Sequence, residues 1–75
     1  MYLAWFDDHP RKELRFKIAE AIFAYEDRFG ERPNVVLVNA TQIFNEDVEG
    51  VRIVSRSYVR KDNFWVGIEG IVASS

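Results

Sequence analysis

Apolar and polar positions alternate along the chain in segments that predict one long helix and several strands. Tyr2–Phe6 is a short aromatic run that ends at two aspartates, which is typical of a strand. Between residues 10 and 29, apolar side chains recur every three or four positions, as they do along an amphipathic helix. Pro10 suits the first helical turn, and Gly30 suits a left-handed C-cap. The apolar stripe of this predicted helix comprises Leu14, Ile18, Ala21, Ile22, Tyr25 and Phe29.

The second half of the chain predicts three further strands. Residues 35–38 form an unbroken aliphatic run, which favours a central strand that is covered on both faces. Residues 51–55 and 64–69 alternate as half-buried strands do, and the arm between them turns near Asp62. Asn39 predicts a short helix, because Gln42 follows at the position of a capping box.

These elements predict a single α+β domain that spans residues 1–75. We expect a mixed four-stranded sheet with one long amphipathic helix packed on one face, in the order strand, long helix, strand, short helix, strand, strand. A strand–helix–strand unit favours parallel neighbouring strands, and the last two strands could pair as an antiparallel hairpin. The strand order stays open, because more than one mixed arrangement satisfies the same alternation.

The helix carries a second apolar stripe that points away from the first. At 100° per residue, Phe16, Ala19 and Phe23 lie opposite the face that should cover the sheet. Trp65 and Tyr58 likewise need cover that one helix cannot provide. Exposed apolar patches usually mark an interface, so we expect a homodimer with Phe16, Ala19, Phe23 and Trp65 as candidate interface residues. The alternative is that other segments of the same chain cover them.

Composition supports self-association, because the other usual aids to a small core are missing. The chain has no cysteine and one histidine, which removes disulfides and the common structural zinc sites. Hydrophobic residues make up 48% of the chain, enough to fold. The sequence shows no basic N-terminal segment and no apolar run of about 20 residues, so we expect a cytoplasmic protein without membrane contact.

A basic stretch with an aromatic residue gives an alternative function. Arginine and lysine interleaved with aromatics on a sheet are typical of single-stranded nucleic-acid binding. The ten basic and twelve acidic residues give a net charge of −2, which weighs against that partner. A salt-bridged strand edge is the competing interpretation. The residues concerned are Arg52, Arg56, Tyr58, Arg60 and Lys61.

Asp7, Asp8 and His9 are the first candidates for metal binding or acid–base chemistry. They precede the predicted helix, where aspartate ordinarily caps, and capping is the interpretation that we favour. The four glycines stand apart and form no phosphate-binding loop, and no nucleophile elbow is present. We therefore expect no enzyme, no catalytic or metal-binding residue and no cofactor.

Three segments together resemble a family of short uncharacterised bacterial proteins. They are residues 1–8 (MYLAWFDD), residues 32–39 (RPNVVLVN) and residues 63–67 (NFWVG). The resemblance runs over most of the chain and implies a complete bacterial protein. It implies no activity, cofactor or site residue.

Overall fold

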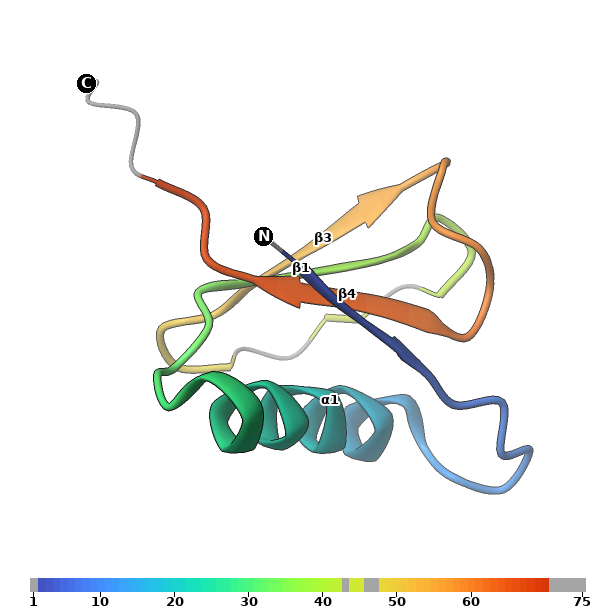
Figure 1. The fold of residues 1–75 in the computed structure, drawn as a ribbon. Helices are drawn as coiled ribbons and strands as arrows, with labels where there is room; N and C mark the ends of the chain where they lie inside the picture. The colour runs from blue at the N-terminus through green and yellow to red at the C-terminus, as the bar shows by residue number, and fades with distance from the viewer. Residues whose placement is uncertain (1, 43, 46–47, 71–75) are drawn as a thin grey trace.

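The computed structural model describes residues 2–42, 44–45 and 48–70, which form one helix and a four-stranded sheet. The helix lies against one face of the sheet, as Figure 1 shows. This confirms the predicted α+β fold with a mixed sheet. The elements are β1 (Tyr2–Phe6), α1 (Leu14–Phe29), β2 (Val35–Asn39), β3 (Arg52–Arg56) and β4 (Asn63–Gly67).

The sheet has the strand order β1-β4-β2-β3. β4 is antiparallel to both of its neighbours, whereas β2 and β3 are parallel. β1 and β2 therefore run in the same direction, but β4 separates them, and they are not the neighbours that a strand–helix–strand unit favours. β3 and β4 form no hairpin either, because β2 lies between them.

Burial explains why the last strand enters the middle of the sheet. Phe64 and Val66 of β4 are fully buried, so this strand needs a neighbour on each side. Arg52 and Arg56 of β3 are exposed, and charged ends suit an edge strand. The prediction that residues 35–38 form a central strand is confirmed, since β2 pairs with β4 and β3.

Helix α1 begins at Leu14, four residues after the predicted start at Pro10. The Asp7 carboxylate accepts a hydrogen bond from the backbone N–H of His9 (3.0 Å), and this turn takes the chain away from β1 before the helix begins. Glu13 is the N-cap and makes no side-chain capping bond. The C-terminus matches the prediction, because Gly30 is left-handed (φ 71°) and donates its N–H to the Glu26 carbonyl.

The main core lies between α1 and the sheet. The predicted helical stripe supplies its helix side, with Ile18, Ala21, Ile22 and Tyr25 buried. Fully buried residues of β2 and β4 supply the sheet side. They are Val36, Val38, Phe64 and Val66.

A smaller core lies on the other face of the sheet, where Val35 and Leu37 pack against Val59 from the segment that follows β3. Asn39 holds this segment, because its amide group donates to the Val59 carbonyl (2.6 Å). The short helix expected after Asn39 is not formed by residues 40–42, which make a turn. Gln42 bonds to Asp62 instead of closing a capping box, and Ile43 lies outside the described residues.

Candidate functional site

The second apolar stripe of α1 is exposed, as its helical angle predicted. The side chains of Phe16 and Phe23 are 50% and 69% accessible, and Ala19 is also exposed. Trp65 does not join them. It packs with the core on the far face of the sheet, so the sheet separates it from the helical stripe.

A groove runs between α1 and strand β1 and ends beside Phe23. Leu3 and Trp5 form its floor, since both side chains of β1 point towards the helix. Its far wall is the flank of α1 that faces β1. This wall contains Glu20, Phe23, Ala24, Asp27 and Arg28.

The two edge strands of the sheet differ in their protection. β3 carries Arg52 and Arg56 at its ends, whereas β1 has the sequence YLAWF, without charge, proline or glycine. Edge strands in natural proteins are usually protected by charge, by proline or by cover, because their free backbone groups can pair with another chain. Within the described residues, β1 pairs with β4 alone. The β1 edge, defined as strand β1 with the adjoining groove, is therefore an unprotected apolar surface.

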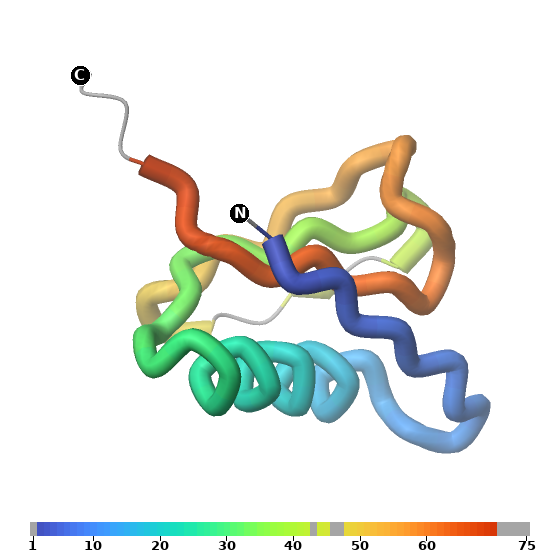
Figure 2. The backbone as a smooth tube through the Cα atoms, in the orientation of Figure 1, coloured from blue at the N-terminus to red at the C-terminus, as the bar shows by residue number. Residues whose placement is uncertain are grey.

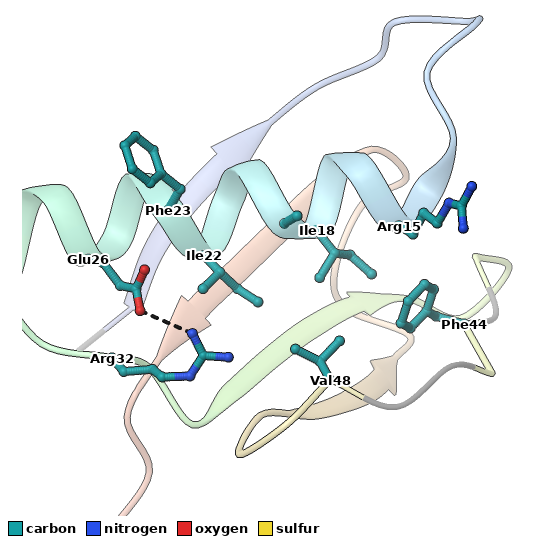
Figure 3. Close-up of a pocket in the computed structure, with 9 residues that line it drawn as sticks. Arg15, Ile18, Ile22, Phe23, Glu26, Arg32, Phe44 and Val48 are labelled. Atoms are coloured by element: carbon teal, nitrogen blue, oxygen red, sulfur yellow. Dashed lines mark hydrogen bonds and ion pairs between the residues drawn. The ribbon is translucent and has the colours of Figure 1, made fainter.

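A second cleft of about 300 Å³ lies on the opposite flank of α1. Figure 3 shows Ile18 and Ile22 facing Phe44 and Val48 across it, while Phe23 points away. At its end, Arg32 donates to the Glu26 carboxylate (3.1 Å). An apolar interior closed by an ion pair offers no nucleophile or acid–base pair.

The face of the sheet turned away from α1 carries a row of three aromatic rings, and we call this surface the open sheet face. Trp65 lies in the middle, with Tyr58 at a centroid separation of 5.6 Å and Tyr2 at 6.4 Å. Tyr58 is 60% exposed. No helix of the described chain covers this face in Figure 1.

The basic residues singled out from the sequence divide between two places. Arg52 and Arg56 lie on the open sheet face, because they alternate with Ile53 and Ser55 and share the side of Val54. Lys61 instead lines a polar groove near Asp8 and His9. The structure thus brings Arg52, Arg56 and Tyr58 together with Trp65 and Tyr2, which the nucleic-acid hypothesis had not included. Arg60 is exposed in the segment between these two places.

One end of the open sheet face is held by a polar network around Glu69. The Tyr2 hydroxyl donates to Glu69 (2.7 Å), and Arg52 donates to the same carboxylate. The hydrogen bond to Glu69 raises the pKa of Tyr2. The same bond, assisted by Arg52, lowers the pKa of Glu69. Arg52 is thus partly neutralised, whereas Arg56 contacts no carboxylate among the described residues.

Asp7, Asp8 and His9 do not form a metal site. The described residues contain no group of three or more histidine, cysteine or carboxylate side chains placed to hold a metal ion. Asp7 instead accepts hydrogen bonds from the His9 backbone and from Lys12 Nζ (2.8 Å). The bond to Lys12 lowers the pKa of Asp7. The prediction that these residues cap the helix is wrong, because α1 begins at Leu14 with Glu13 as its N-cap, and Asp7 instead stabilises the turn before α1.

Sequence reasoning missed two features. The first is the lack of protection on β1, for which the signal was its uncharged sequence beside the Arg-flanked residues 52–56. The second is the row of rings, which depends on β4 and β1 being neighbours and had no local signal.

Comparison with known proteins returns no matching protein family, curated protein or solved structure. In the described part of the chain, no helix has the length and apolarity needed to cross a membrane.

Proposed function

We propose that this protein is a self-associating interaction domain that forms a two-fold homodimer through the β1 edge. The observation that carries the proposal is the uncharged, five-residue edge strand that continues into an apolar groove. Two copies of β1 that pair antiparallel around Ala4 join the two sheets into one. Leu3 of each chain then lies opposite Trp5 of the other, on the helix side.

The charges on the helix flank support this arrangement. Glu20, Ala24 and Arg28 are spaced four residues apart and form one row along the groove wall. In an antiparallel pair centred on Ala24, Glu20 of one chain faces Arg28 of the other, twice. Arg28 has no ion pair among the described residues, and its partner carboxylate would come from the second copy.

Side chains that line the groove can fill the space between the two α1 helices of the dimer. Strands lie about 4.8 Å apart in a sheet, and α1 packs over β4, so the two α1 helices would be farther apart than the 8–10 Å of direct helix contact. Phe23 and Trp5 of both chains can occupy that gap, and the long Glu20 and Arg28 side chains can reach across it. The most exposed phenylalanine of α1 is buried in this way.

Light scattering after size-exclusion chromatography tests the dimer over a dilution series. We expect a mass of twice 8.8 kDa for the wild type and a monomer for Phe6→Lys. Phe6 is 61% exposed, so the lysine places a charge on the edge without disturbing the core. A wild-type mass of 8.8 kDa at every concentration would refute the proposal.

A charge exchange tests the helix flank. Glu20→Lys and Arg28→Glu each place like charges opposite one another, so each should weaken the dimer at least about ten-fold. The double variant restores the pairs between chains but not the Lys12–Glu20 ion pair within each chain (2.7 Å), so it should bind more tightly than either single variant. Arg15→Glu, on the other flank of α1, is the control with the same change of charge.

The two exposed phenylalanines form a matched pair that separates this interface from the outward face of the helix. Phe23→Glu should dissociate the dimer, because Phe23 borders the groove. Phe16→Glu should not, because Phe16 lines neither the groove nor the cleft on the opposite flank. Equal dissociation by both variants would move the interface to the Phe16, Ala19 and Phe23 stripe.

A further inference from the structure

We propose that the open sheet face binds single-stranded nucleic acid by stacking bases on the row formed by Tyr2, Trp65 and Tyr58. The three rings are neighbours, with centroid separations of 5.6 and 6.4 Å, and Tyr2 and Tyr58 are exposed. Any base can stack on an aromatic side chain, so such a row tolerates many sequences. A duplex keeps its base faces covered, which makes a single strand the suitable ligand.

Charge on the same face matches the phosphate backbone. Residues 52–70 contain four basic and two acidic side chains, while the rest of the chain contains six basic and ten acidic ones. The net charge of −2 therefore conceals a basic segment, of which Arg52 and Arg56 lie on the open sheet face, whereas Lys61 lines a separate groove. Arg56 lies on the open sheet face with its guanidinium donating only to the Ser55 carbonyl among the described residues, so a phosphate can displace that contact.

The two acidic side chains in this region are already engaged. The Asp62 carboxylate accepts one hydrogen bond from Gln42 (2.9 Å) and lies 3.4 Å from Lys17 Nζ. Glu69 binds Arg52 and the Tyr2 hydroxyl. Repulsion of phosphate by these carboxylates is consequently reduced, and Arg56 is the cationic side chain of the open sheet face without an ion pair among the described residues.

This proposal does not rest on the homodimer, because the β1 edge and the open sheet face are different surfaces. Strand pairing uses the backbone edge of β1, whereas Tyr2 projects from its face. A dimer would place two aromatic rows on one continuous sheet. Phe23→Glu, on the helix side of the sheet, can therefore abolish the dimer without changing the open sheet face and leave a measurable affinity for nucleic acid, so failure of one proposal is distinguished from failure of the other.

Fluorescence anisotropy with a labelled twelve-nucleotide oligouridylate and an oligothymidylate of equal length tests the proposal. We expect binding of at least one at about 50 mM NaCl, with protein up to about 100 µM, the weak end of the non-specific range. With two or three phosphate contacts, raising NaCl to about 200 mM should weaken binding roughly ten-fold. The two probes show whether ribose or deoxyribose is preferred.

Variants locate the site. Tyr58→Ala should weaken binding at least about five-fold, whereas Tyr58→Phe keeps the ring and should bind like wild type. Arg56→Glu should weaken binding at least about ten-fold, whereas Arg15→Glu makes the same charge change on α1 and should have no effect. No anisotropy change with either probe, or full affinity in both Tyr58→Ala and Arg56→Glu, would overturn the proposal.

Discussion

Lys17 is a buried charged residue of α1 that lies beside the apolar stripe predicted from the sequence. Its side chain is only 9% accessible, and its ammonium group lies 3.4 Å from Asp62 at the end of the sheet. Asp62 itself has a left-handed backbone (φ 66°) and exchanges two hydrogen bonds with Gln42. A buried ammonium needs an anionic partner, so these three residues tie α1 to the turn before β4.

Removing the Asp62 carboxylate should destabilise the protein through Lys17. We expect Asp62→Ala to lower the free energy of unfolding by about 1–3 kcal/mol in urea denaturation. Asparagine at position 62 keeps the hydrogen bond to Gln42 and tolerates the left-handed backbone. Asp62→Asn should therefore lower the free energy of unfolding by less than Asp62→Ala does. In the Lys17→Met background the cost of Asp62→Asn should shrink, because no buried charge is left unpaired. Equal costs in both backgrounds would exclude this coupling.

Ionisation of Asp7 should make the folding stability of the protein depend on pH in the acid range. The hydrogen bond from Lys12 lowers the pKa of Asp7 below its ordinary value of 3.8, so the folded state favours the ionised carboxylate. The stabilisation is therefore complete above pH 3.8 and is lost as the pH falls through the lower, folded-state pKa. At pH 7, Asp7→Asn should lower Tm by roughly 2–6 °C, and the difference from wild type should vanish in strong acid. A difference that does not diminish as the pH falls below 3.8 would contradict this account.

The sequence predicts those helices and strands that are determined by residues close together along the chain. The helical stripe, the C-cap at Gly30 and the central strand at residues 35–38 all follow from side-chain spacing and from glycine and proline positions. The start of α1 was wrong by four residues, because the Asp7 turn uses the residues that resemble a helix N-terminus. The short helix after Asn39 failed over residues 40–42, because Gln42 finds a distant partner in Asp62.

Substitution of Gly30 tests how much the left-handed C-cap contributes to the stability of α1. A Cβ added there meets no atom within 4 Å, so the cost of a side chain comes from the left-handed backbone alone. Gly30→Ala should destabilise by about 1 kcal/mol, which corresponds to a Tm decrease of roughly 4–8 °C, and Gly30→Asn should cost less. Gly70→Ala is the control, because its added Cβ is equally free and its φ is not positive. Equal effects of Gly30→Ala and Gly70→Ala would exclude backbone strain.

For the whole molecule, the predicted exposure of the second stripe is confirmed, and Trp65 lies on the face of the sheet that α1 does not cover, so a shared interface of Trp65 with the stripe stays a prediction. Helical angles place Phe16 and Phe23 without knowledge of the sheet. The face that Trp65 occupies depends on the register of β4 between β1 and β2, which spans most of the chain. Both candidate surfaces depend on this register, because it puts β1 at one edge and gathers the aromatic row.

The position of β4 also determines when the chain can fold during synthesis. β1 and β2 have no common neighbour until residues 63–67 exist, and Figure 2 shows this late segment lying between much earlier ones. A nascent chain that ends before residue 63 lacks the strand that fills the middle of the sheet, and its aliphatic β2 is left without a partner on that side. An aliphatic strand without its partner is prone to aggregation, so formation of the complete sheet depends on β4.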